Sequence, residues 1–290
     1  MPIDSWPYTP RFHTLRSGSR MHYVDEGPRQ AETLLCVHGN PSWGYLFRPL
    51  VAGLSSSYRL VVPDHAGCGR SDKPFDSRYR LAQHVDNLEE LVLALDLSDL
   101  TLVLHDWGGA IGMGLAARRP ERIRRLVLMN TAAYRSSRIP LRIAACRWPL
   151  IGELALLGAN AFVRAALAMA VERPLSAEAR AAYLAPFPSW SSRKAQLAFV
   201  RDIPMRAGHP SWDTLVEIEQ SLERFADRPA LLVWGERDWC FTTAFRDEWR
   251  QRLPHAESIG LPRAGHWLLE DEPDAVVAHV RDFLARHPLR

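Results

Sequence analysis

The chain has 290 residues, a formal net charge of +3 at pH 7, and 47% hydrophobic and 24% charged residues. This length allows one large domain or a core domain with an insertion, and the composition excludes a disordered chain. The arginines are interspersed with acidic residues and form no basic tract, so nucleic acid is not an expected partner.

Short apolar runs alternate with helical patterns along most of the chain. Two runs near the N-terminus, 12–15 and 20–24, flank a Ser-Gly-Ser turn and predict a hairpin. Residues 81–95 carry apolar side chains at helical spacing and predict a covering helix. Further short runs predict strands at 34–37, 60–62, 102–104, 126–129 and 231–234, with a weaker one near 258–260. The alternation is typical of an α/β protein with a mostly parallel sheet and helices on both faces.

The strand signal disappears between about residues 132 and 210. This segment is rich in Ala, Leu and Arg and contains several prolines, which predicts a helical insertion. We therefore predict a core in two parts, residues 1–131 and 213–290, and a helical cap at 132–212 that follows the sixth strand. The longest apolar stretch, 150–171, is interrupted by charged residues and is too polar to span a membrane.

The cysteines and the N-terminal residues give no sign of secretion or of a metal site. The cysteines form no CxxC pair and have no histidine at a ligand spacing: Cys36, Cys68, Cys146 and Cys240. We expect them to be reduced thiols. The first twelve residues lack a basic region followed by an apolar one, so a cytoplasmic location is expected. No metal and no cofactor are expected.

The sequence HDWGG, residues 105–109, follows the apolar run 102–104 and precedes a helix of small residues. It resembles a nucleophile elbow, a tight strand-to-helix turn that exposes one side chain. That position holds Asp106, whose charged form the following helix N-terminus favours. A carboxylate forms an ordinary ester when it attacks saturated carbon, but a high-energy anhydride when it attacks a carbonyl. The turn predicts displacement at saturated carbon, with a helix cap by Asp106 as the alternative.

Polar side chains also follow other predicted strands, at the same edge of the sheet. Asn40 offers an amide donor for a departing anion and Trp107 an indole N–H, although an Asn-Pro turn also accounts for Asn40. Asp238 and His266 complete the chain order nucleophile, acid, histidine. We expect Asp238 to orient His266, and His266 to act as general base or acid. His105 is interpreted as structural, because neighbouring strand residues point to opposite faces.

Five motifs occur in order along nearly the whole chain: HGNPSW, PDHAGCGRSDKP, HDWGGAIG, WGERD and AGHW. Together they resemble the α/β-hydrolase fold and, within it, the haloalkane-dehalogenase-like group with an aspartate nucleophile. The helical insertion corresponds to the cap of that family. One branch of the group takes its acid as a glutamate after the strand that follows the nucleophile helix. Here that site reads Leu128-Met129-Asn130-Thr131 and holds no acid, so Asp238 has to serve.

Asn40 and Trp107 combined with a late aspartate resemble the third dehalogenase subfamily. The stretches NTAAY, RYRL and ERFADRPALLVWGERD resemble the β-lactone decarboxylases of bacterial long-chain olefin biosynthesis. That resemblance implies a lyase that converts a cis-3-alkyl-4-alkyl β-lactone (oxetan-2-one) into a cis-olefin and CO2. It implies a hydrophobic small-molecule substrate, and it leaves room for assembly with other olefin-biosynthesis enzymes.

Three alternatives stay open. A haloalkane dehalogenase shares the attack of Asp106 on saturated carbon and then uses His266 to activate the water that hydrolyses the ester. An epoxide hydrolase ranks third, because that group is expected to have tryptophan in place of Asn40 and a pair of cap tyrosines, whereas the insertion holds only Tyr134 and Tyr183. A small-molecule receptor on the same fold is the non-catalytic alternative.

Apolar residues of the insertion give a modest hint about the substrate. They either line a channel for long alkyl chains or pack the cap onto the core. These residues are Leu154, Leu156, Leu157, Phe162, Ala166, Leu167, Met169 and Val171.

Overall fold

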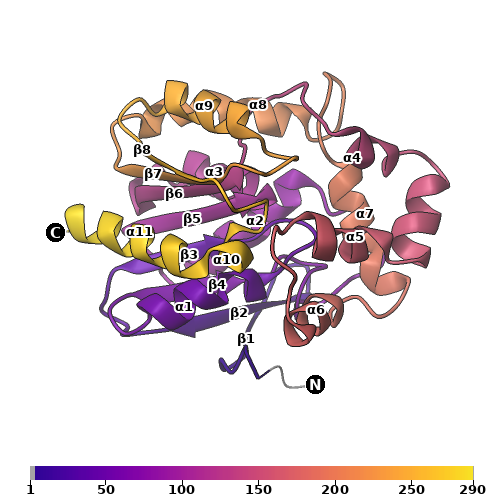
Figure 1. Ribbon diagram of the computed structural model, residues 1–290, viewed down its shortest axis with the longest axis horizontal. Coiled ribbons are helices and arrows are strands. Elements are labelled where there is room, and N and C mark those ends of the chain that lie inside the picture. Colours follow the sequence, from indigo (N-terminus) through magenta and orange to yellow (C-terminus); the bar gives the residue numbers. More distant parts are fainter. Residues whose placement is uncertain (1–3, 290) are drawn as a thin grey trace.

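The computed structural model describes residues 4–289 and contains one eight-stranded sheet with helices on both faces (Figure 1). Its strands are β1 (Arg11–Thr14), β2 (Arg20–Glu26), β3 (Thr33–Val37), β4 (Arg59–Pro63), β5 (Leu100–Asp106), β6 (Ile123–Thr131), β7 (Ala230–Gly235) and β8 (Glu257–Leu261). Their order is β1-β2-β4-β3-β5-β6-β7-β8. The β1–β2 and β2–β4 pairs are antiparallel and all others are parallel. The predicted hairpin and strands are confirmed, and the weaker strand at 258–260 is the partly exposed β8.

Side chains of each central strand alternate between two apolar cores. In β3, for example, Leu35 and Val37 belong to one core, and Leu34 and Cys36 to the other. Helices α2 (Leu81–Ala94), α3 (Trp107–Arg118), α8 (Trp212–Ser221) and α9 (Thr243–Arg252) contribute to the first core. Helices α1 (Arg48–Leu54), α10 (Leu268–Asp271) and α11 (Pro273–Arg286) contribute to the second. Because both faces of the sheet are covered, the central strands have continuous apolar sequences.

Residues 132–211 contain the remaining four α-helices and no strand. They are α4 (Leu141–Ala145), α5 (Ala161–Met169), α6 (Ala177–Leu184) and α7 (Lys194–Arg201). Figure 1 shows them gathered beside the sheet, on the right of the view. Shorter helical segments are η1 (Gly44–Phe47), η2 (Pro120–Arg122), η3 (Glu153–Gly158, a π-helix), η4 (Ser191–Arg193) and η5 (Leu222–Phe225).

The division into a core of residues 1–131 and 213–290 and a cap of residues 132–212 stays a prediction. Residues 1–3 and 290 of the two core parts lie outside the described residues. Within residues 4–289, no helix has both the length and the apolar character needed to cross a membrane.

Candidate active site

Asp106 lies at the turn between β5 and α3. Its φ of 53° is a left-handed backbone conformation, which is strained for a residue with a side chain. The turn also brings backbone segments too close for side chains. A Cβ on Gly108 would lie 1.9 Å from the carbonyl oxygen of Val37, and one on Gly39 would lie 1.8 Å from Asp106 Oδ1. The Asp106 side chain makes no capping hydrogen bond to α3, which contradicts the helix-cap alternative.

The Asp106 carboxylate is buried and held from two sides. The backbone N–H of Asn40 donates to Oδ1 at 2.6 Å, and His266 Nε2 lies 3.6 Å from Oδ2. Burial on its own would raise the pKa of Asp106, but the neighbouring His266 outweighs it and holds the pKa below its usual range. The carboxylate is therefore ionised and fixed in place, as a nucleophile requires.

His266 lies between two carboxylates. Its Nδ1–H donates to Asp238 Oδ2 at 2.8 Å, while Nε2 faces Asp106. Burial on its own would lower the pKa of His266, but Asp238 and Asp106 outweigh it and raise the pKa to about 10. The ring is therefore an imidazolium at neutral pH. The three residues expected from the sequence to form a triad are brought together by the fold.

Asn130, at the end of β6, is a polar residue of the site to which the sequence analysis gave no role. Its Nδ2 donates to Asp238 Oδ2 at 2.9 Å and to the Gly235 carbonyl at 3.0 Å, and its Oδ1 accepts from the Gly235 N–H at 2.8 Å. The Cys240 N–H donates to the other Asp238 oxygen at 2.6 Å. Asn130 thus lies where one branch of the group has its glutamate, and it orients Asp238, which follows the neighbouring strand β7.

His105 supports the loop that carries His266. Its Nε2–H donates to the His266 carbonyl at 2.8 Å, and the two rings lie 4.6 Å apart. Burial and the nearby charge of His266 lower the pKa of His105 to about 4, so the ring is neutral. His105 is not among the residues that line the cavity described next.

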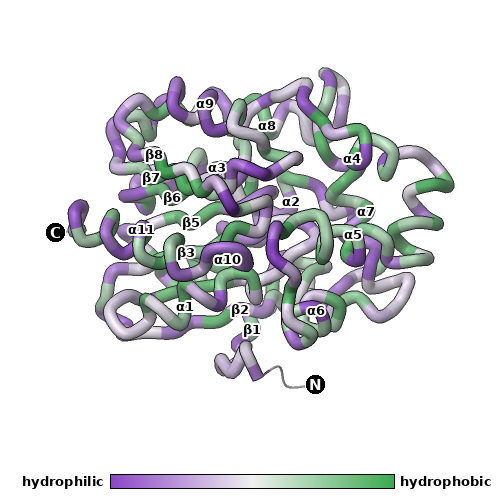
Figure 2. The backbone as a smooth tube through the Cα atoms, viewed as in Figure 1, coloured by the Kyte–Doolittle hydropathy of each residue, from purple (hydrophilic) through white to green (hydrophobic). Residues whose placement is uncertain are grey.

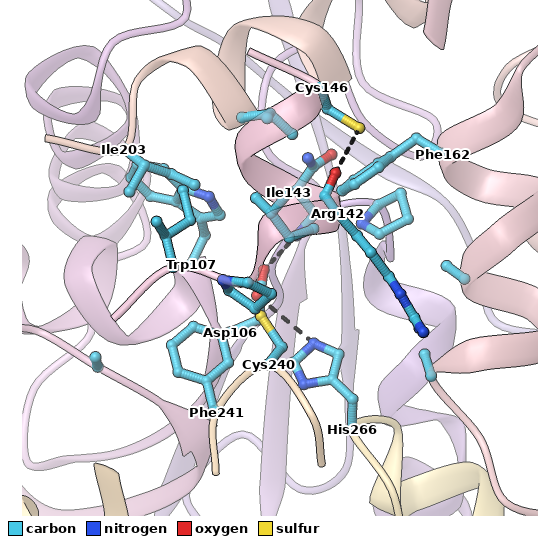
Figure 3. A pocket seen from close by; sticks show the side chains of 18 of the residues that line it. Asp106, Trp107, Arg142, Ile143, Cys146, Phe162, Ile203, Cys240, Phe241 and His266 are labelled. Atoms are coloured by element: carbon cyan, nitrogen blue, oxygen red, sulfur yellow. Dashed lines mark hydrogen bonds and ion pairs between the residues drawn. The ribbon is translucent and has the colours of Figure 1, made fainter. Parts of the chain in front are cut away.

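A cavity of about 440 Å³ lies above Asp106, and its lining is almost entirely apolar. Asp106, Trp107 and His266 face it from the sheet side, as Figure 3 shows. The cap contributes Ile143, Cys146, Phe162 and Ile203, among others. Such a space suits an apolar substrate whose reactive group meets a few polar side chains at one end.

The apolar residues of the insertion divide between the two alternatives, channel lining and packing. Four of the eight residues line the cavity: Leu156, Phe162, Ala166 and Met169. Three others pack inside apolar clusters instead: Leu157, Leu167 and Val171. Leu154 matches neither alternative, because 69% of its surface is exposed.

Asn40 and Trp107 both line the cavity. The Asn40 side chain donates its Nδ2 to the Gln196 carbonyl of α7 at 3.2 Å, and its Oδ1 has no hydrogen-bond partner within residues 4–289. Trp107 packs edge-on against Phe199 of the same helix, with ring centroids 5.4 Å apart. An anion that accepts from the Asn40 amide has to compete with the Gln196 carbonyl, and the anion-binding roles of both residues stay predictions.

The two tyrosines of the insertion have engaged hydroxyls. Tyr134 donates to the Phe245 carbonyl at 3.0 Å, and Tyr183 donates to Glu270. Neither hydroxyl is directed at Asp106, so the paired tyrosines expected of an epoxide hydrolase are not formed by Tyr134 and Tyr183.

Comparison with known proteins gives a consistent picture. A family profile described as alpha/beta hydrolase fold matches residues 32–273. The chain is 44% identical to the cis-3-alkyl-4-alkyloxetan-2-one decarboxylase of Shewanella oneidensis, over 93% of this chain and 86% of that protein. It is 41% identical to the enzyme of the same name from Xanthomonas campestris, over the full length of both. The crystal structure of haloalkane dehalogenase DbeA from Bradyrhizobium elkani matches with a TM-score of 0.88 and 32% identity, over 96% of this chain and 98% of that one.

Proposed function

This chain belongs to the α/β-hydrolase-fold family, and we propose that it is a cis-3-alkyl-4-alkyl β-lactone decarboxylase, a lyase that yields a cis-olefin and CO2. The identity of 41–44% to oxetan-2-one decarboxylases, against 32% to the dehalogenase, supports decarboxylation over hydrolysis. In the structure, the supporting observation is the ionised Asp106 beside an imidazolium at the end of an apolar cavity.

In the first step, the Asp106 carboxylate attacks the ring carbon that bears the lactone oxygen. The bond from that carbon to the ring oxygen breaks, the configuration inverts, and an ester to Asp106 forms while the ring carboxylate is released. An almost entirely apolar cavity favours this step, because a bound apolar substrate displaces the water that would solvate the nucleophile. Asn40 and Trp107 stabilise the released carboxylate at the cavity wall.

In the second step, the released carboxylate leaves as CO2. The electrons of its bond to carbon form the double bond, and the ester bond to Asp106 breaks, which regenerates the free carboxylate. No water is consumed. Inversion followed by anti elimination converts a cis-lactone into a cis-olefin.

His266 decides between this outcome and hydrolysis. An imidazolium has no lone pair with which to take a proton from water, so it cannot act as a general base. The ester neutralises Asp106, but the released carboxylate supplies a new negative charge nearby and keeps His266 protonated. The Phe241 ring also stacks over His266, with centroids 5.7 Å apart and an angle of 16° between the planes, and covers one face of the imidazolium.

Haloalkane dehalogenase is the second candidate, and the similarity to a dehalogenase structure favours it. Purified protein should be given a cis-3,4-dialkyl β-lactone and, separately, 1-bromohexane, with olefin and halide measured. We expect olefin from the lactone, and none from the Asp106→Ala variant. Halide release without any olefin would establish the dehalogenase instead. Binding of either compound without turnover would support the alternative that the protein is a small-molecule receptor.

We further propose a cytoplasmic location and assembly with the enzymes that form the β-lactone, as the resemblance to olefin-biosynthesis decarboxylases implies. Assembly is tested by size-exclusion chromatography of the chain mixed with a purified lactone-forming enzyme. A shared early-eluting peak is expected, and separate elution at all concentrations would contradict it.

A further inference from the structure

Large apolar side chains are exposed together on one stretch of the insertion. Of the nine such side chains in residues 4–289, five lie between residues 141 and 154. We call these five the cap patch: Leu141 (87% exposed), Trp148 (60%), Leu150 (74%), Ile151 (49%) and Leu154 (69%). Figure 2 shows hydrophobic stretches along this part of the chain, near the α4 label and to its right. Large exposed apolar patches are typical of surfaces that bind a protein, a membrane or a ligand.

The same stretch is apolar on its inner side as well. Ile143 and Cys146 line the cavity from one half of the stretch, and Leu156 lines it from η3, two residues after the patch ends. A segment with apolar side chains on two opposite sides is normally covered on both. Here the inner side faces the cavity, whereas the outer side is bare in the described residues. We therefore expect the exposed outer side of residues 141–154 to bind an apolar partner.

The charge of the insertion narrows the choice of partner. Residues 132–212 contain eleven Lys and Arg against four Asp and Glu, a net charge of +7, whereas the rest of the chain carries twenty-five against twenty-nine, a net of −4. Glu153, the acid inside the patch stretch, is paired with Arg201 at 2.6 Å. Arg142, Arg147 and Arg206 have no acidic side chain within ion-pair distance in residues 4–289. An apolar patch among uncompensated arginines fits an anionic surface.

The mouth of the cavity is next to the patch. Arg142 is exposed and yet lines the cavity, which places it at the boundary between the two. Its guanidinium lies 5.6 Å from the ring of Trp239, another cavity residue. Leu141, the most exposed member of the patch, is its neighbour in the chain. A surface that covers the patch therefore reaches the entrance of the cavity.

We propose that the cap patch docks the protein on an anionic lipid surface, so that long-chain substrate and product pass between the lipid and the cavity. The passage rests on the proposed function, whereas the docking does not. Trp148 and the leucines insert at the level of the headgroups, and the surrounding arginines bind lipid phosphates. A second copy fits less well, because patch-to-patch contact would bring the unpaired arginines of the insertion, Arg142, Arg147 and Arg206, close to those of the other copy.

Docking is tested by co-sedimentation with vesicles made of equal parts of phosphatidylglycerol and phosphatidylcholine. The full chain should sediment with these vesicles, less with pure phosphatidylcholine, and less in high salt, because salt screens the arginines. The Trp148→Ser/Leu154→Ser variant should bind at least about tenfold more weakly, because two inserted side chains are lost. The Phe12→Ser/Leu93→Ser variant removes two exposed apolar side chains that lie outside the insertion. It should bind as the unchanged protein does.

Olefin formation supplies the second readout. With a long-chain lactone embedded in vesicles, the Trp148→Ser/Leu154→Ser variant should be slower by about the same factor, while a short soluble lactone should react at the unchanged rate. This control also shows that the variant is folded. If no lactone reacts at all, the proposed function fails, but the sedimentation result still decides docking.

Two outcomes would overturn the docking proposal. In the first, neither vesicle binds the unchanged protein, or the patch variant binds as well as it does. In the second, the unchanged protein is a dimer by sedimentation equilibrium, the patch variant is a monomer, and neither binds vesicles. The patch would then be an interface between copies of the chain.

Discussion

The polar end of the cavity and the cap above it differ in what holds them. Asp106, Asp238 and His266 are buried at the ends of strands or in the loops that follow, and each is fixed by short hydrogen bonds or a charged neighbour. Helix α4, which forms part of the cap wall, contains no buried residue and holds its place by partial apolar contact. From this comparison we expect the sheet edge to fix the chemistry and to tolerate little change, and the cap to tune the choice of substrate.

The largest effect is expected from replacing Asp106, the proposed nucleophile. Asp106→Asn keeps the shape of the side chain but removes the charge that attacks carbon, so olefin formation should fall by about 10⁴-fold or more. Lactone binding, measured by calorimetry, should persist because the cavity walls are unchanged. Olefin formation within about tenfold of the unchanged protein would show that the chemistry does not depend on this end of the cavity.

His266→Gln should lower olefin formation by about 10²-fold or more, because the imidazolium between two carboxylates is lost. Stability should respond to pH as well. The pKa of His266 rises from 6.5 to about 10 on folding, so its contribution to stability is complete below pH 6.5 and disappears as pH rises toward 10. Chemical denaturation should therefore show a difference between the two proteins that shrinks over this range. A constant difference would contradict the charged state.

A smaller effect is expected from Asn130, which positions Asp238 without touching the substrate. Asn130→Ala should lower kcat by about tenfold with little change in KM. The alkaline limb of the pH profile should move to lower pH, because a less well placed Asp238 supports the imidazolium less. Asn160→Ala is the matched control, since Asn160 is a buried amide in the insertion that donates to the Phe187 carbonyl at 3.4 Å. An unchanged pH profile for Asn130→Ala would assign it a purely structural role.

The smallest effect is expected in the cap. Phe162→Ala enlarges the cavity. It should change the ratio of the KM values for a shorter-chain and a longer-chain lactone by about threefold, with kcat nearly unchanged. Leu167→Ala should instead lower the stability by about 2–5 kcal/mol without changing the preference, because Leu167 packs in the core. Equal effects of both variants on chain-length preference would remove the distinction between cavity lining and packing.

The sheet and the three reactive residues could be predicted because their signals are local. A strand that is covered on both faces is a continuous apolar run, and a polar residue directly after such a run marks the functional edge of the sheet. Asp106 and Asp238 follow runs of this kind, and His266 follows in the expected order. A single sequence was therefore sufficient to predict this end of the cavity.

Contacts between distant segments could not be predicted in the same way. Asn130 follows a buried strand like the other site residues, but its partner Asp238 comes from the next strand, and the sequence does not record that pairing. The residues that line the cavity from the insertion could not be told from those that pack there, for a local reason. Leu154, Leu156 and Leu157 lie in a π-helical segment, where the helical period departs from 3.6 residues, so spacing does not show which of them faces the cavity.

The fate of the lactone carbonyl carbon tests the central claim most directly. A cis-3,4-dialkyl β-lactone labelled at that carbon should be mixed with the purified protein, and the label should be followed in the gas phase and in solution. We predict that the label appears in CO2, with one CO2 for each cis-olefin formed, and that Asp106→Ala releases none. Label retained in a soluble β-hydroxy acid as the main product would show that water, rather than decarboxylation, resolves the Asp106 ester.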